Sequence, residues 1–186
     1  MNYTILKSDI DLLRSAGVNE SDTRHCLKVA GKALEIARRI GDSGIDQELV
    51  GRGALFHDLG KAKTHEIDHG KIGAEMGKKL GLPQSVTDIM EKHIRGGLTE
   101  NEASELGLPV KDYALKTLEE KIVIYADRLV DIITDGIVVI HDEAEAEKRF
   151  EEILRTWEKY SKNETTLNRY LGYHREIQEL IGRNEG

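Results

Sequence analysis

Proline is almost absent from this chain, and its absence constrains the fold more than any other feature. Only Pro83 and Pro109 occur among 186 residues. Proline-free stretches rich in alanine, leucine, glutamate, lysine and isoleucine favour helix. We find no alternating apolar and polar pattern of strand length and no internal repeat. The sequence therefore predicts an all-α fold.

Helical spacing of apolar residues and the positions of glycines predict where the helices run. They are expected over residues 9–16, 22–40, 46–57, 68–80, 83–93, a short stretch after 99, 118–134, 143–161 and 165–181. Side chains suited to helix starts are Ser21, Asp46 and Asp68 as N-caps, and Thr99 with Glu102 and Thr117 with Glu120 as capping boxes. No linker divides these helices, so we expect one domain over residues 1–186.

Charge and cysteine content narrow the class of protein. The formal net charge of -7 gives no electrostatic reason to hold nucleic acid, which argues against a DNA or RNA binder. It still permits a small phosphorylated ligand, because a metal ion can supply local positive charge. The single cysteine, Cys26, excludes an intramolecular disulfide and is typical of a reducing compartment.

Membrane insertion and secretion are not expected. No apolar run approaches the roughly 20 residues that span a bilayer. The segment from Met1 to Leu13 lacks the apolar core of a signal peptide. We therefore predict a cytoplasmic protein, and the sequence leaves open whether it forms a homo-oligomer.

Three polar features stand out on the predicted helices. His25 shares an apolar stripe with Val29, and a polar ring on such a face needs a partner. His57 and Asp58 are adjacent at a predicted helix end, where both could hold one ion. Asp127 lies on the same face as apolar residues, and a buried carboxylate needs a cation, hydrogen-bond donors or a metal.

Together these residues form a set of nitrogen and oxygen ligands from three helices. Such a set suits Fe, Mn, Co, Ni or Zn. His69 and His93 lie at predicted helix ends beside loops and would extend it to six ligands, enough for two ions. The alternative is that these two are ordinary loop histidines.

The order of these residues resembles the HD superfamily, whose pattern is a histidine, a His-Asp pair and a later aspartate. The matching strings are RHCLKVAGKALEIA, GALFHDLGK and IVIYADRL. DHGKIGAEM and IMEKHIRGG add the histidines of a two-metal branch that includes the bacterial diadenosine tetraphosphate hydrolases. The resemblance covers about residues 20–135 and leaves the C-terminal helices, within 143–182, unassigned. It implies a compact helical bundle of HD-domain type.

The resemblance also implies a ligand set. His25, His57, Asp58 and Asp127 would hold one divalent transition metal. Asp58 would bridge to a second ion on His69 and His93. The implied activity is metal-dependent hydrolysis of a phosphate ester or anhydride by a metal-bound hydroxide, with a small nucleotide as the expected substrate.

Three further residues are candidates for contact with the substrate. Lys61, one turn after His57, is expected to bind phosphate oxygens and to assist catalysis together with Asp58. Arg128 could bind phosphate or pair with a neighbouring acid. His65, in the loop before His69, could protonate a leaving group or be an exposed histidine without a role.

Two other functions remain open at this point. A nucleotide-binding sensor or regulatory HD module would need no turnover, but such modules usually lack some ligands, and every expected one is present here. A di-iron oxygenase uses the same kind of donor set. Lys61 behind the His-Asp pair favours a phosphorylated substrate over a neutral one, so hydrolysis is the preferred prediction.

Overall fold

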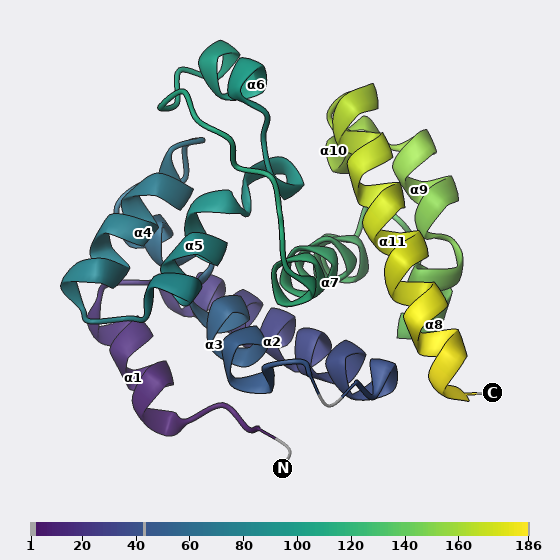
Figure 1. The fold of residues 1–186 in the computed structure, drawn as a ribbon, viewed down its shortest axis with the longest axis horizontal. Coiled ribbons are helices and arrows are strands. Elements are labelled where there is room, and N and C mark those ends of the chain that lie inside the picture. The colour runs from purple at the N-terminus through teal and green to yellow at the C-terminus, as the bar shows by residue number, and fades with distance from the viewer. Residues whose placement is uncertain (1–2, 43, 186) are drawn as a thin grey trace.

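The computed structural model describes residues 3–42 and 44–185, and every regular element in this part of the chain is a helix (Figure 1). The elements are α1 (Lys7–Ser15), α2 (Glu20–Ile40), α3 (Gln47–Phe56), η1 (Leu59–Ala62), α4 (His69–Lys79), α5 (Gln84–Lys92), η2 (Ile94–Gly96), α6 (Glu100–Glu105), α7 (Leu118–Thr134), α8 (Glu143–Lys148), α9 (Phe150–Thr156), α10 (Glu158–Ser161) and α11 (Glu164–Glu185). The predicted all-α class is confirmed. Within the described residues, none of the helices combines the length and apolar character needed to cross a bilayer.

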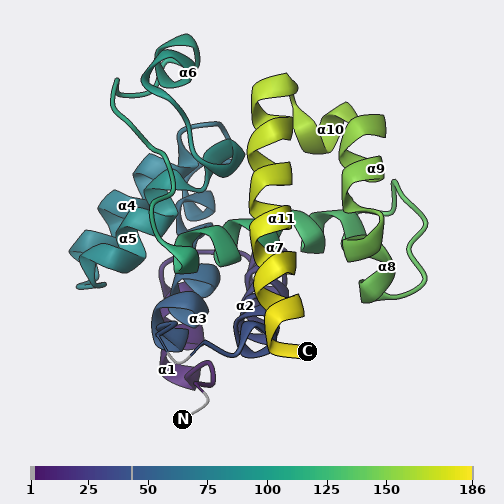
Figure 2. The ribbon, with the colours of Figure 1, turned by 45° about the vertical axis from the view of Figure 1, so that its right-hand side comes forward.

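Helix α7 runs through the middle of the bundle. It packs against α2 and α3, while α4 and α5 pair with each other beside η1 and α3. Helices α4 and α5 lie on one side of α7, and α8 to α11 lie on the other (Figure 1). Helix α11 crosses α7, as the turned view makes clear (Figure 2), and it also contacts α2.

The sequence of α7 explains its central place. Every residue from Ile122 to Ala126 is fully buried. A helix that is apolar on all sides must be covered on all sides. Helix α2 instead buries one stripe, which includes Val29 and Ala33, and leaves charged residues exposed.

Several predicted helix starts are confirmed and one is wrong. Both capping boxes, at Thr99 and Thr117, are formed. Asp46 caps α3 through the Leu49 amide. Helix α2 begins earlier than predicted, because the side chain of Asn19, rather than Ser21, accepts the hydrogen bond of the Asp22 amide. The other two expected starts differ in detail, since Asp68 makes no capping hydrogen bond and Pro83 lies just before α5.

The helix predicted over residues 143–161 is divided into α8, α9 and α10. The chain leaves helical geometry at Arg149 (φ -95°, ψ 7°) and is extended at Trp157 (φ -117°, ψ 99°). Neither position carries a glycine or proline. These two bends allow Phe150, Leu154 and Tyr160 all to be buried, so tertiary packing overrides the local helical preference.

A second, smaller apolar cluster lies apart from the main core. Its buried members are Ile94, Leu98, Ala103, Leu108 and Tyr113. This cluster holds together residues 94–113, the excursion that carries α6 and stands away from the rest of the bundle (Figure 1). The excursion begins at η2, directly after His93.

Candidate metal centre

Three of the predicted histidines are fixed in the same way by local backbone. Each places its Nδ1 atom against the carbonyl oxygen three residues earlier: His57 on Ala54 (2.7 Å), His69 on Glu66 (2.7 Å) and His93 on Met90 (2.6 Å). A carbonyl can only accept, so Nδ1 carries the proton in all three rings. In the neutral form of each ring the Nε2 atom therefore has a free lone pair, which is the arrangement that metal-ligating histidines show.

Asp58 lies between two pairs of histidines. Its Oδ2 atom is 3.2 Å from Nε2 of His57 and 3.7 Å from Nε2 of His25. Its Oδ1 atom is 3.3 Å from Nε2 of His69 and 3.4 Å from Nε2 of His93. The carboxylate is 2 % exposed, so it has little water to solvate it. Each oxygen thus faces its own pair of rings.

The remaining two predicted ligands come from helices that pack together. His25 on α2 places its Nε2 atom 2.9 Å from Oδ1 of Asp127 on α7. Nε2 of His57 is 3.4 Å from the same oxygen. The structure therefore brings all six predicted ligands, from five separate segments, into one cluster.

The hydrogen bonding within the cluster is incomplete, and the incomplete atoms are those that a cation would satisfy. Nε2 of His57 is buried and makes no hydrogen bond to any described residue. Nε2 of His69 and Nε2 of His93 are 2.9 Å apart, although both rings carry their proton on Nδ1. Two lone pairs facing each other are repulsive unless a positive charge lies nearby. This set of imidazole and carboxylate donors fits a divalent transition metal.

Burial and neighbouring charges shift the pKa values of the cluster residues in opposite directions. Burial tends to raise the pKa of Asp58, but the charge of a protonated His57 ring beside it holds that pKa well below its usual range. Burial lowers the pKa of His93. Burial would lower the pKa of His57, but the charges of Asp58 and Asp127 raise it well above its usual value. A cation that binds to the His57 ring must therefore displace a proton from it.

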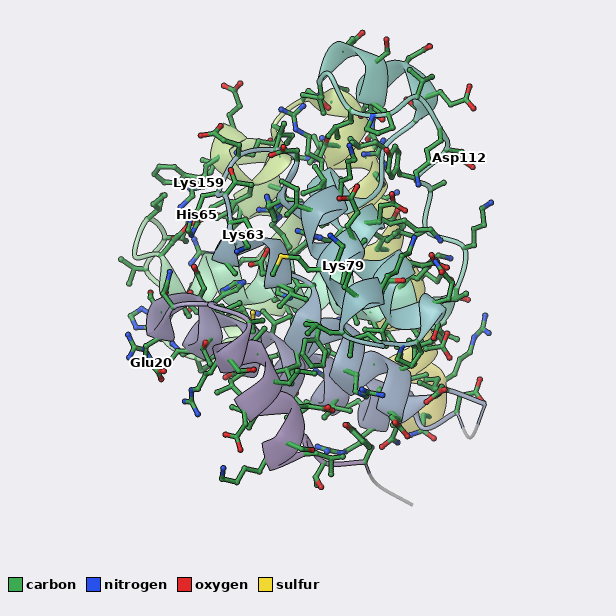
Figure 3. All side chains as sticks on the ribbon, turned by 90° about the vertical axis from the view of Figure 1, so that its left-hand side faces the viewer. Glu20, Lys63, His65, Lys79, Asp112 and Lys159 are labelled. Atoms are coloured by element: carbon green, nitrogen blue, oxygen red, sulfur yellow. The ribbon has the colours of Figure 1, made fainter. Side chains whose placement is uncertain are left out.

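The three residues predicted to contact the substrate lie in different surroundings. Nζ of Lys61 is 2.6 Å from Oδ2 of Asp58, so this lysine lies at the cluster. Arg128 lines the same cavity and also forms the acid pair, with Asp131 at 3.2 Å. His65 lies at the surface (Figure 3), where its 60 % exposed side chain pairs with Asp22 at 2.9 Å. The structure therefore does not bring His65 to the cluster.

A cavity of about 270 Å³ opens over the cluster and includes residues that the sequence analysis missed. They are Asp131, Arg95, Lys162 and Tyr170. Asp131 forms a third group of potential ligands with His25 and Asp127. Its spacing of four from Asp127 on one helix was the available signal. Burial and the charge of Asp127 raise the pKa of Asp131 to about 6.

The chain is similar to several known proteins. A family model described as the HD domain matches residues 23–131. The uncharacterized protein MJ0778 of Methanocaldococcus jannaschii is 42% identical over 165 residues, which are 88% of this chain and 91% of the relative. A tRNA (cytidine(56)-2'-O)-methyltransferase of Picrophilus torridus is 35% identical over 173 residues, 93% of this chain but 46% of the relative.

A solved structure shows the same fold. It is the HD domain of the L. monocytogenes phosphodiesterase PgpH in complex with cyclic-di-AMP. The TM-score is 0.57 at 19% identity, covering 94% of this chain and 96% of that one. The fold likeness thus extends beyond residue 131, into the C-terminal part of the chain that supplies Lys162 and Tyr170 to the cavity.

Proposed function

Because the chain belongs to the HD domain family, we propose that it is a metal-dependent hydrolase of phosphate esters or anhydrides. One observation carries the proposal. His57, His69 and His93 each have Nδ1 committed to a backbone carbonyl and Nε2 directed at the Asp58 carboxylate. A cluster held for structural reasons alone would not need three rings oriented alike around one buried carboxylate.

The donors support two ions rather than one. His25, His57, Asp58 and Asp127 would hold the first, and His69 and His93 the second. The two oxygens of Asp58 face different histidine pairs, which suits a bridging role. When bound, such ions lower the pKa of water and take up charge on phosphoryl oxygens.

Lys61 is assigned the task of binding the phosphoryl group. Its ammonium is 2.6 Å from Asp58, at the edge of the ligand set. Burial lowers the pKa of Lys61, but the charge of Asp58 outweighs it and keeps the pKa above the usual value. A lysine that stays protonated can hold a phosphoryl oxygen and offset the charge that grows on it. The neighbouring Asp58 keeps this ammonium positioned when no substrate is present.

A small nucleotide is the substrate class we propose. The solved HD domain similar to this chain binds cyclic-di-AMP, which joins nucleotides through phosphodiesters. The Picrophilus methyltransferase is a different case, because this chain spans less than half of that protein. Methyl transfer is therefore not assigned to this chain.

The first test is metal content followed by turnover. Protein purified without chelator should contain close to two transition-metal ions per chain. Phosphate monoesters, cyclic dinucleotides and dinucleoside polyphosphates should then be screened with Mn, Fe(II), Co and Ni under anaerobic conditions. Anaerobic hydrolysis would distinguish a hydrolase from an oxygenase. If metal-loaded protein hydrolyses none of these substrates, the proposed hydrolase function is wrong.

A double variant tests the number of ions. His69→Ala with His93→Ala should lower the metal content from two toward one and abolish most hydrolysis. The matched control is His65→Ala with His141→Ala, two exposed histidines, which should retain both ions. If the first double variant keeps both its metal and its turnover, the two-ion proposal is wrong.

A further inference from the structure

One wall of the cavity over the cluster is formed by three cations. Arg95 comes from η2, Arg128 from α7, and Lys162 from the residue that follows α10. Two of the acids in this cavity, Asp58 and Asp127, face the histidines. The third, Asp131, pairs with Arg128. The wall therefore carries more positive charge than the protein neutralises.

Arg128 is held rigidly and yet incompletely paired. Arg128 is only 9 % exposed. Nη2 donates to the hydroxyl of Tyr170 (3.1 Å), and the guanidinium lies over the same ring at 4.7 Å. Its Nε atom is buried without a hydrogen bond to any described residue. A buried donor without a partner is costly. The guanidinium to which this atom belongs is on a residue that lines the cavity, where a bound anion would offset its charge.

Lys162 and its near neighbour Lys159 differ in pairing. Lys159 pairs with Asp135 at 2.6 Å. Lys162 forms no ion pair with any residue in the described part of the chain. Lys162 is exposed, and its partial desolvation together with the charges of Arg128 and Arg95 lowers its pKa. Three cations that repel one another are stabilised by a bound anion.

The backbone at this wall is strained at two positions. Among residues 3–42 and 44–185, Arg95 (φ 50°) and Lys162 (φ 61°) are the only non-glycine residues with positive φ. Lys162, with ψ -50°, is the centre of a γ-turn closed by the Asn163 amide on the Ser161 carbonyl at 2.7 Å. This form of γ-turn is rare in proteins. Strain of this kind is concentrated at ligand sites.

Helix α11 holds the strained η2 segment in place. Arg169 donates to the carbonyl of Arg95 at 3.0 Å, and Tyr173 donates to the carbonyl of Gly96 at 2.8 Å. The same helix supplies Tyr170, which stacks on Arg128. The C-terminal helix thus braces two of the three cations against the cavity.

We propose that Arg95, Arg128 and Lys162 form a subsite for a second phosphate group of the substrate, one that is not cleaved. This inference rests on the phosphohydrolase function proposed above and narrows its substrate. The metal ions and Lys61 would take the phosphate that is cleaved, while the three cations would take the other. Substrates are then small molecules with at least two phosphate groups, such as dinucleotides or nucleoside bisphosphates.

Binding of non-hydrolysable probes tests this subsite without turnover. The probes are alkylene bisphosphonates with one to four carbons between the phosphonates, each compared with the alkyl monophosphonate of the same length. Dissociation constants are measured by calorimetry on Mn-loaded protein. We expect at least one bisphosphonate to bind about tenfold or more tightly than its monophosphonate, as a charge-assisted contact provides.

Variants then identify the cations responsible. Lys162→Met and Arg95→Met should each remove most of this advantage, whereas Lys159→Met should preserve it. Lys162→Gly removes the same ammonium and tolerates positive φ, so it provides a folded variant if Lys162→Met is unstable. No bisphosphonate advantage in the unmodified protein, or an advantage that survives loss of Lys162 and Arg95, would overturn the subsite.

The two proposals can fail separately. Hydrolysis of phosphate esters without any bisphosphonate preference would overturn the subsite and leave the hydrolase intact. A Lys162-dependent preference in a protein that hydrolyses nothing would support the subsite and reject the hydrolase.

Discussion

Lys61 and Lys63 are two positions apart but have different environments. Lys61 contacts Asp58 at the cluster, whereas Lys63 is exposed on the surface (Figure 3). Lys61→Met should lower kcat by about 10²–10³-fold, the usual effect of losing one donor to a developing oxyanion. Its metal content should stay unchanged. Lys63→Met is the control and should keep full activity, and equal kcat values for the two variants would remove Lys61 from the mechanism.

At the residue scale, the sequence predicted the members of the histidine and aspartate cluster better than it predicted the cavity wall. His57 and Asp58 are adjacent, and Asp127 lies on an apolar helix face, so local patterns singled them out as candidate ligands. Arg95 and Lys162 could not be found in this way. They are distant in sequence, and only the packing of α11 on η2 brings them to one cavity.

The packing of η1 on α4 depends on close approach of backbone. A Cβ atom on Gly60 would lie 1.9 Å from the carbonyl oxygen of His69 and 2.7 Å from the amide nitrogen of Gly73. Backbone cannot move aside as a side chain can. Gly60→Ala should therefore cost about 1–3 kcal/mol of folding free energy and lower metal content, because His69 must shift.

Gly172→Ala is the matched control for that substitution. Gly172 is exposed on α11, and its added Cβ would meet nothing within 4 Å. Alanine in a helix interior is better than glycine by about 0.5–1 kcal/mol, so this variant should be slightly more stable. Urea unfolding of both variants gives the comparison, and similar midpoints would refute the close-packing argument.

Helix α11 also makes a pH-sensitive contact with α7. The hydroxyl of Tyr125 is 2.8 Å from Nδ1 of His174. Burial lowers the pKa of His174. The unfolded chain, where histidine has a pKa of about 6.5, therefore binds more protons, and stability falls as the pH drops through this range.

The variant His174→Asn isolates this effect. Asparagine retains an oxygen acceptor but does not titrate. We expect the unmodified protein to lose more stability than His174→Asn between pH 7 and pH 5, measured by urea unfolding. Between pH 7 and pH 8 the difference between the two proteins should be constant. Parallel curves throughout would show that His174 makes no such contribution.

At the element scale, a helix boundary was predicted correctly when the residues that determine it are close together in sequence. The capping boxes at Thr99 and Thr117 need only residues three positions apart, and both helices begin as predicted. The segment over residues 143–161 has uniform helical preference. Its bends at Arg149 and Trp157 arise from burial against distant helices, which local sequence does not record.

At the scale of the whole molecule, metal binding should stabilise the fold. The proposed ligands come from α2, the two residues that follow α3, α4, the residue that follows α5, and α7, so an ion would link most of the bundle. Chelation should lower Tm, and adding Mn or Co should restore it. A metal at 100 times its Kd contributes about 2.7 kcal/mol. Mg should restore less, since it prefers oxygen donors. A Tm unaffected by chelator in protein shown to have lost its metal would contradict this linkage.

The small apolar cluster under α6 has a consequence for motion. With five buried side chains of its own, this excursion can open while the main core stays folded. We expect its backbone amides to exchange with deuterium faster than those of α7. Opening must break the contacts that Arg169 of α11 makes with Glu102 and with the carbonyl of Arg95, and only then would it release Arg95 and widen the cavity. Entry and exit of a ligand that fills the cavity would then depend on how often this segment unfolds locally.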